Sequence, residues 1–281
     1  FFYAPNLHGI DPKAMHARYL PFLENLVSRA DLNYLMDDML GELCIGHMFP
    51  GGGDLPFKPG IPGGLLGADY AFENNRYRIT RIYDGERWNP GLVAPLAQPG
   101  INAKVGEYVL AIDGKELTQV NDIYEKLEAK AGRQVVVKLG PNPDGSGSRE
   151  VTVVPVASET QLRFRAWAED NRRYVEKATN GRAGYVHVPD TATGGWTSFL
   201  RYYYANVSRD GVVVDERFNS GGLITDFIVN EMMKPLSAVF HWRYGKDWPT
   251  PGSAVFGPKV MIVNQYAGSG GDMLPWLFKH H

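Results

Sequence analysis

The sequence has 281 residues, enough for about two domains with separate hydrophobic cores. Its 44% hydrophobic and 21% charged residues are ordinary for a globular protein, and a net charge of −2 favours neither nucleic acid nor an anionic membrane as partner. No apolar run approaches the roughly 20 residues that span a bilayer. We therefore expect no nucleic-acid partner and no membrane partner, and we expect a cytoplasmic protein. The single Cys44 excludes an internal disulfide framework.

The first 60 residues form a helical segment by their pattern. Asp11 and Pro12 suit an N-cap and a first helical turn, and apolar residues then recur at helical spacing, which predicts helix over 11–43. Residues 50–64 are rich in proline and glycine, which indicates a loop and a domain boundary.

Residues 61–157 form a second unit, which is rich in short strands. Asp113 and Gly114 predict a tight turn, and residues 121–130 suit a short helix. The predicted strands are 78–83, 108–112, 134–139 and 151–154.

From residue 158 helices and apolar strands alternate, which predicts an α/β core with a mostly buried sheet. The expected helices are 159–177, 197–206 and 223–233, and the expected strands are 184–188, 211–214 and the run before Ser269. The overall fold class is therefore α/β and α+β, multidomain, with three domains at 1–60, 61–157 and 158–281.

Ser269 lies between Gly268 and Gly270 on the turn from the last strand to apolar residues of helical character. A serine on such a turn can present its hydroxyl at the edge of a sheet, beside backbone N–H groups that can stabilise an oxyanion. A structural alternative is a helix capping box, because Asp272 follows Ser269 by three residues. The chemistry needs a nearby base, since a free serine is a weak nucleophile.

Gly221 and Gly222 form a second glycine-rich turn after a buried strand. Their amides could face an oxyanion, or the turn could simply connect a strand to a helix. No lysine follows as in a P-loop, which disfavours a nucleotide site. His47 and Asp54 lack a third ligand at useful spacing, so we expect no metal. We also expect no cofactor.

Several segments, taken in order, resemble two known families. Residues 64–70 (GLLGADY) and 101–117 (INAKVGEYVLAIDGKEL) resemble a PDZ domain. Residues 184–190 (GYVHVPD), 210–222 (DGVVVDERFNSGG) and 264–272 (NQYAGSGGD) resemble the C-terminal processing peptidases.

Residues 41–54 (GELCIGHMFPGGGD) narrow the resemblance to the tricorn branch, whose catalytic histidine precedes its PDZ domain. The resemblance covers about 30–281, and the amino-terminal propellers and carboxy-terminal end of full-length tricorn proteases are not in this sequence.

The resemblance implies a serine peptidase that hydrolyses oligopeptides through an acyl-enzyme. Ser269 would be the nucleophile and His47 the general base. Amides of Gly221, Gly222 and Gly270 would form the oxyanion hole. The resemblance also implies a homo-oligomer.

The PDZ resemblance implies a peptide-docking loop as well. Its residues are Leu65, Leu66, Gly67 and Ala68, whose backbone amides would hold the carboxylate of a peptide that adds to the sheet as a strand.

Gly270 stands where the archaeal enzyme has an acidic residue linked to a preference for basic side chains, so the resemblance does not carry that preference over. Two other departures from the family pattern keep a second interpretation open. Gly46 stands where the catalytic tetrad has a serine. The tetrad's own acid lies beyond residue 281 in the family pattern. The alternative is a catalytically degenerate peptide-binding PDZ module on an inactive peptidase-like core.

Overall fold

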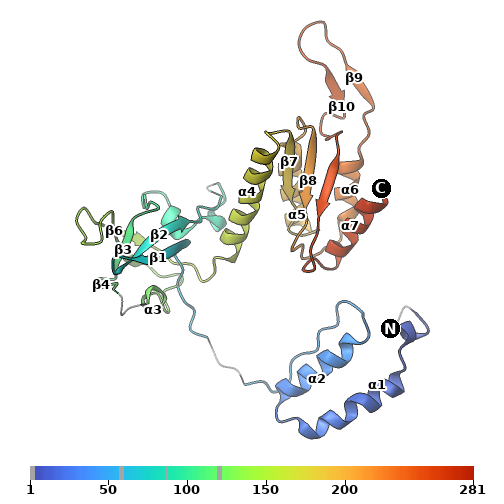
Figure 1. Ribbon diagram of the computed structural model, residues 1–281, viewed down its shortest axis with the longest axis horizontal. Coiled ribbons are helices and arrows are strands. Elements are labelled where there is room, and N and C mark those ends of the chain that lie inside the picture. The colour runs from blue at the N-terminus through green and yellow to red at the C-terminus, as the bar shows by residue number, and fades with distance from the viewer. Residues whose placement is uncertain (1–3, 57–59, 87, 119–121) are drawn as a thin grey trace. The chain divides into compact units, whose positions relative to one another are not determined.

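The computed structural model describes residues 4–56, 60–86, 88–118 and 122–281, which fall into two compact units, 1–60 and 61–281. Figure 1 shows the helices of the first unit and the two sheet-containing parts of the second. Among the residues described, none of the helices has the length and apolar character that a membrane crossing demands. The division into three domains stays a prediction.

The first unit consists of short helices. They are η1 (Leu7–Gly9), α1 (Pro12–Tyr19), η2 (Leu20–Asn25) and α2 (Arg29–Gly41), where η denotes a 3-10 helix.

Asp11 caps α1, as expected, by accepting the amides of Lys13 and Ala14. The helical character predicted for 11–43 is confirmed, but the region is divided, because η2 follows α1 and Ser28 starts a new helix through a capping box with Asp31.

The first part of the second unit is a six-stranded sheet in the order β1-β2-β3-β5-β6, with β4 paired to β3. Its elements are β1 (Ala68–Glu73), β2 (Arg76–Ile82), η3 (Pro90–Leu92), η4 (Pro95–Ala97), β3 (Tyr108–Ile112), β4 (Lys115–Glu116), α3 (Ile123–Lys126), β5 (Val135–Gly140) and β6 (Arg149–Val153). The predicted turn at Asp113 and Gly114 connects β3 to β4, with φ of 47° and 74°. The helix predicted over 121–130 is present but shorter, because α3 covers only Ile123–Lys126. Asn121 lies outside the described residues.

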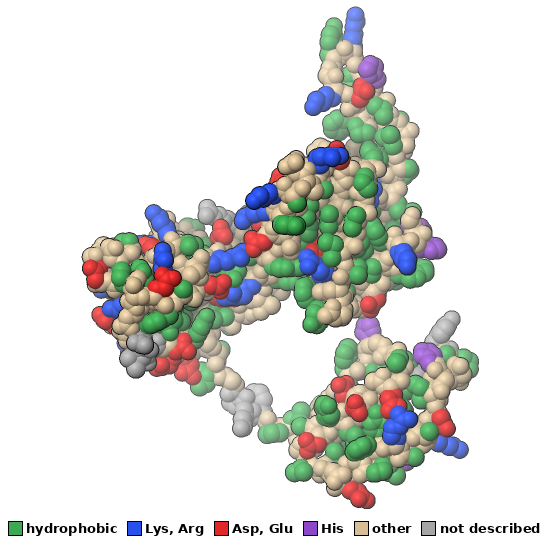
Figure 2. Space-filling model, in the orientation of Figure 1, with side chains coloured by type: hydrophobic (Ala, Val, Ile, Leu, Met, Phe, Trp, Pro, Cys, Tyr) green, Lys and Arg blue, Asp and Glu red, His purple; other side chains and the backbone are tan. Residues whose placement is uncertain are grey.

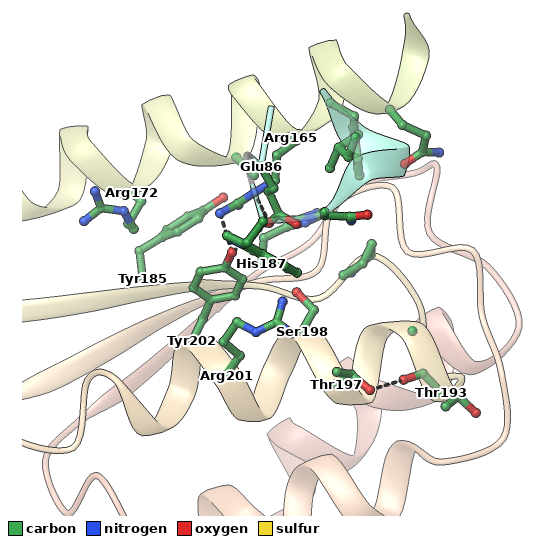
Figure 3. A pocket seen from close by; sticks show the side chains of 18 residues that line it. Glu86, Arg165, Arg172, Tyr185, His187, Thr193, Thr197, Ser198, Arg201 and Tyr202 are labelled. Atoms are coloured by element: carbon green, nitrogen blue, oxygen red, sulfur yellow. Dashed lines mark hydrogen bonds and ion pairs between the residues drawn. The ribbon is translucent and has the colours of Figure 1, made fainter. Parts of the chain in front are cut away.

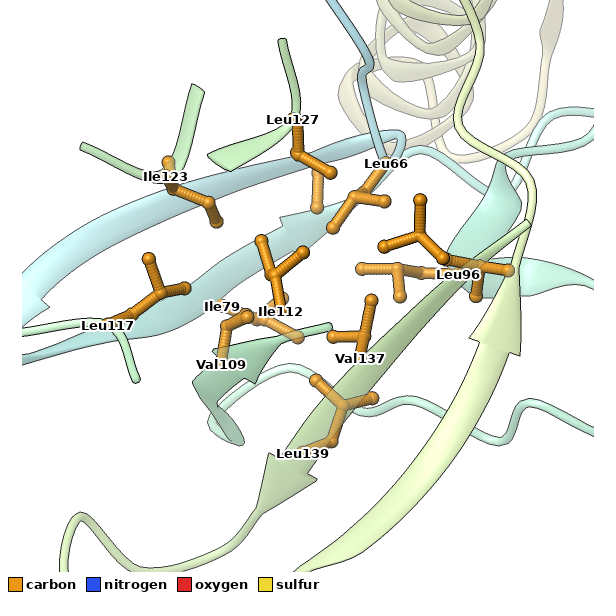
Figure 4. Packing of buried hydrophobic residues seen from close by; sticks show 13 residues of the cluster. Leu66, Ile79, Leu96, Val109, Ile112, Leu117, Ile123, Leu127, Val137 and Leu139 are labelled. Atoms are coloured by element: carbon orange, nitrogen blue, oxygen red, sulfur yellow. The ribbon is translucent and has the colours of Figure 1, made fainter. Parts of the chain in front are cut away.

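Alternate residues of these strands point to one face and form a buried apolar core (Figure 4). Leu66 from the loop before β1, Leu96 from η4 and Ile123 from α3 close over that face. Leu66 therefore anchors the loop that resembles a carboxylate-binding segment to the core of this sheet.

The second part is an α/β layer with a parallel sheet in the order β11-β8-β7. Its elements are α4 (Thr160–Ala178), β7 (Ala183–His187), α5 (Thr193–Tyr204), β8 (Gly211–Asp215), α6 (Thr225–Met233), β9 (Ala238–Phe240), β10 (Trp248–Thr250), β11 (Lys259–Ile262) and α7 (Gly270–His280). The expected alternation is confirmed, although α5 begins at Thr193 rather than 197 and the β9–β10 hairpin was not predicted.

Strand β8 is the central strand of this sheet, and its Val212 and Val214 are buried against residues of α5, α6 and α7. The carboxyl ends of the three parallel strands lie at one edge of the sheet, because parallel strands share a direction. The turns after β8 and β11 therefore meet at that edge, where ligands of open α/β sheets bind.

Candidate active site

Ser269 occupies the strained turn between β11 and α7. Its φ of 58° and ψ of −118° are unusual for a residue with a side chain, and such geometry costs on the order of 1–3 kcal/mol. The capping-box interpretation is wrong: the side chain of Ser269 accepts no cap hydrogen bond, and the amide of Asp272 donates to the backbone oxygen of Ser269 at 3.0 Å. The exposed hydroxyl is thus free for chemistry.

The two predicted glycine turns meet at this serine. Gly221 has φ of 87°, and a Cβ at that position would lie 2.7 Å from the Cβ of Ser269. A Cβ on Gly270 would lie 2.2 Å from the oxygen of Gly222 and 2.2 Å from Oγ1 of Thr191. Neither position tolerates a side chain without a backbone shift, so the glycines permit close approach of the two turns.

The amides of the three glycines differ in availability. Gly221 donates its amide to Oδ1 of Asn219 at 2.8 Å and is engaged in its own turn. Within the described part of the chain, the amides of Gly222 and Gly270 have no hydrogen-bond acceptor. Gly270 is the first residue of α7, where an N–H without an intrahelical partner is expected. Gly222 and Gly270 are therefore the better candidates for oxyanion donors.

Two residues that the sequence did not single out hold the turns together. The fully buried Asn219 accepts the amide of Gly268 at 3.1 Å through its backbone oxygen. Thr191 donates its amide to Gly221 at 2.9 Å and accepts that of Ile224 at 3.0 Å. Asn219 could have been found from its place at the start of the glycine turn, whereas nothing near Thr191 in the sequence marks it.

A buried carboxyl group lies on the segment that connects β8 to the glycine turn. Glu216 follows β8, is fully buried, and neither of its carboxyl oxygens has a hydrogen-bond partner among the described residues. Burial raises the pKa of Glu216 to about 8, with further repulsion from Asp272 and Asp215. Glu216 therefore carries a proton at neutral pH.

The neighbouring Asp215 is paired instead. Its carboxylate accepts from Arg217 at 2.5 Å and from the Tyr185 hydroxyl at 2.7 Å, so Asp215 and Arg217 form a structural ion pair. These hydrogen bonds outweigh burial and lower the pKa of Asp215. This pair fixes the strand end from which the glycine turn departs.

Exposed apolar side chains flank the turn. Phe218 and Tyr266 stack with ring centroids 5.4 Å apart, and Leu223, directly after Gly222, is 94% exposed. Figure 2 shows many hydrophobic side chains on the visible face of the α/β layer. An extended peptide laid past Ser269 would contact apolar surface.

His47 is exposed, has φ of 66° and makes an edge contact with Phe49 at 6.4 Å between ring centroids. It belongs to the first unit and Ser269 to the second, so their approach stays a prediction. His187 is a different kind of histidine. It is buried between aromatic rings, its Nε2 lies 3.2 Å from the oxygen of Arg217, and burial lowers its pKa. That environment indicates a structural role.

A cavity of about 430 Å³ opens between α4, β7, α5 and a segment that contributes Glu86, Trp88, Asn89 and Leu92 (Figure 3). Arg165 crosses it and pairs with Glu86 at 2.8 Å. Pro189 and Thr193 line the cavity from the segment that contains Thr191. The cavity therefore borders the same connection that supports Gly222.

The loop predicted to dock a peptide already binds a carboxylate side chain of the same protein. The amide of Gly67 donates to Oε1 of Glu159 at 2.6 Å, and Leu65 exchanges two backbone hydrogen bonds with Val156. Glu159 stands at the start of α4 but makes no side-chain cap there. The sequence could not show this contact, because the partners are 92 residues apart.

Comparison with known proteins agrees with this arrangement of sheets and turns. The model of peptidase family S41 matches residues 182–281, so the α/β layer with Ser269 is an S41-type core. The tricorn protease PDZ domain matches residues 64–158 and the tricorn protease C1 domain matches residues 1–41. The chain therefore belongs to the tricorn protease family, as its ordered motifs indicated.

Curated relatives and a solved structure give the same result. The tricorn protease of Thermoplasma volcanium is 33% identical over 265 residues, which are 94% of this chain and 26% of that protein. The putative tricorn-like protease C-terminal subunit of Sulfurisphaera tokodaii is 34% identical over 273 residues, which are 96% of this chain and 31% of that protein. A crystal structure of the tricorn protease matches with a TM-score of 0.83 and 29% identity, over 95% of this chain and 26% of that one. The chain thus spans about a quarter to a third of these proteins.

Proposed function

We propose that the protein is a serine peptidase that hydrolyses oligopeptides, with Ser269 as nucleophile. The observation that carries the proposal is the position of Ser269 on a strained turn against Gly221 and Gly222. The residue is exposed, and its side chain makes no helix-capping hydrogen bond. Family membership supports it, since the S41 model covers this part of the chain.

The proposed reaction is acyl transfer. Oγ of Ser269 attacks the peptide carbonyl while His47 accepts the hydroxyl proton. Amides of Gly222 and Gly270 stabilise the oxyanion, and each such donor contributes on the order of 2.7–4 kcal/mol to the transition state. The proton then passes from His47 to the leaving amine, and water hydrolyses the acyl-enzyme.

The neutral, buried Glu216 fits this proposal because the residue that leads from β8 into the glycine turn then carries no negative charge. The nearest acidic neighbour on α7, Asp272, is exposed to solvent. A carboxylate facing the oxyanion would oppose the developing charge.

Peptide docking to residues Leu65–Ala68, the homo-oligomer and the cytoplasmic location stay predictions from the resemblance and the composition. The alternative function, an inactive peptide-binding module, is favoured by Gly46 in place of the tetrad's serine.

A hydrolysis assay with a pool of fluorescence-quenched decapeptides tests the proposal in the whole protein. Ser269→Ala should abolish turnover and leave the circular dichroism spectrum unchanged, whereas Ser237→Ala, an exposed serine near the β9 strand, should retain it. Turnover by Ser269→Ala at the wild-type rate would overturn the assignment. A wild-type protein that binds the peptides without cleaving them would favour the inactive module.

A further inference from the structure

The loop that should receive a peptide carboxylate already holds a carboxylate from the chain itself. Glu159 is buried, with 5% of its surface exposed, and accepts the amide of Gly67 at 2.6 Å. This distance is at the short end for an N–H···O hydrogen bond, the end at which hydrogen bonds to carboxylates lie. Gly67 has φ of 77°, and a Cβ there would lie 2.3 Å from Cβ of Ala94, so the loop requires glycine at the point of contact.

A cationic partner compensates the buried charge of Glu159. Arg163, one turn along α4, donates to Oε2 of Glu159 from Nε at 2.9 Å and from Nη2 at 2.6 Å. Its Nη1 also donates to Asp69 at 2.7 Å and to the Tyr83 hydroxyl at 3.0 Å. The guanidinium thus links α4 to β1 and to the residue after β2, at the end of the loop.

Two features show room for a further acceptor at the loop. The amide of Leu66, a buried residue, has no acceptor among the residues that the structure describes. Strand β1 pairs only with β2 in the described sheet, which leaves its other edge open for an added strand. In this loop Glu159 occupies the amide of Gly67, and the backbone oxygen of Val156 occupies that of Leu65, so the amide of Leu66 is the one that a further acceptor could reach.

We propose that Glu159 is an internal competitor for the carboxylate-binding loop of the PDZ-like domain. An extended peptide with a free C-terminal carboxylate docks only when it displaces Glu159 from the amide of Gly67 and from Arg163, which then pairs with the peptide carboxylate. Glu159 stands at the start of α4, and α4 packs on β7 of the core. Displacement of Glu159 by a peptide is therefore coupled to how α4 packs against the peptidase core. This inference rests on the peptide docking included in the proposed function.

Peptide binding measured by fluorescence polarisation tests the proposal. The probes are two fluorescein-labelled hexapeptide pools with identical randomised positions, one with a free C-terminal carboxylate and one with a carboxamide. All measurements use the whole protein in a Ser269→Ala background, so a failure of catalysis does not affect the readout.

Glu159→Ala should bind the carboxylate pool at least about tenfold more tightly than the parent and the carboxamide pool unchanged, since only the carboxylate competes for the released donors. Glu159→Gln, which keeps the side-chain volume, should give a smaller gain of the same sign. Glu159→Ala with Arg163→Ala should lose the gain. Glu176→Ala, at a half-buried acidic residue of the same helix that pairs with Arg172 and Arg209 instead, should behave as the parent.

Equal binding of both pools by Glu159→Ala and by Glu159→Gln would overturn the proposal, as would tight carboxylate-dependent binding by the parent. If Glu159→Ala does not fold, Glu159→Gln alone decides. Peptide hydrolysis is measured separately, in the protein that retains Ser269. A protein that shows the predicted binding pattern but no hydrolysis would therefore refute only the peptidase proposal.

Discussion

Two glycines flank Ser269, and the space around them differs. A Cβ on Gly270 would meet the oxygen of Gly222 and Oγ1 of Thr191 at 2.2 Å, while a Cβ on Gly268 would meet nothing within 4 Å. The acidic residue that archaeal tricorn has after its nucleophile would not fit at Gly270 without a backbone shift. The turn of this protein is therefore built for glycine at that position.

Gly270→Ala should push apart the turns that follow β8 and β11. It should lower the free energy of unfolding by about 1–3 kcal/mol, as overpacking does. It should also abolish peptide hydrolysis, because the amide of residue 270 moves. Gly268→Ala is the matched control and should change neither property. Urea denaturation and the peptide assay provide the measurements, and equal stability of the two variants would contradict the described packing.

Glu216 should make stability depend on pH. Its pKa of about 8 in the folded state lies above the ordinary value of 4.5, so the folded state keeps a proton that the unfolded state has lost. Its contribution is fully present below about pH 4.5 and is lost as pH rises to about 8, with a slope of up to about 1.4 kcal/mol per pH unit.

Urea denaturation between pH 5 and 8.5 measures this effect. Glu216→Gln should flatten the decline of the free energy of unfolding, because glutamine has no proton to lose. The exposed Glu150→Gln should leave the decline as it is. Parallel curves for the wild type and Glu216→Gln would show that Glu216 is not held neutral.

Strands β1 to β6 and α3 form a sheet with its own buried core, which makes residues 61–157 a candidate for independent folding. The isolated segment should unfold in one cooperative transition. Extending it to residue 178 adds α4 with the contacts of Glu159 and Arg163, and should raise the Tm. A disordered NMR spectrum of the shorter segment would contradict the boundary, and an equal Tm would contradict the stabilising role of α4.

At the scale of elements, sequence reasoning succeeded where local pattern decides structure. The α/β alternation and the Asp113–Gly114 turn follow from apolar runs and turn residues. It missed β1 because GLLGADY has the glycine content of a loop, and the strand forms only by pairing with β2. It joined α1 to α2 because the apolar spacing continues through Pro21, where the chain tightens into a 3-10 helix.

Across the whole molecule, the order of motifs predicted the family and brought Ser269, Gly221, Gly222 and Gly270 to one site. Contacts between distant residues were not predictable. Nothing near Glu159 marks it as a partner of Gly67, and the buried state of Glu216 depends on how α7 and β8 pack. The family resemblance alone connects His47 to the site, since nothing in its contacts, an exposed ring beside Phe49, links it to Ser269.

The central claim is that Ser269 is activated by His47, and labelling of the whole protein with a fluorophosphonate tests it most directly, because the reagent reacts with activated serines. We predict a single adduct, mapped by mass spectrometry to Ser269, that is absent in Ser269→Ala and forms at least about a hundredfold more slowly in His47→Ala, as loss of a general base implies. His16→Ala, an exposed histidine of the same unit, should label at the wild-type rate. Absence of labelling in the wild type, or labelling of His47→Ala at the wild-type rate, would contradict the account.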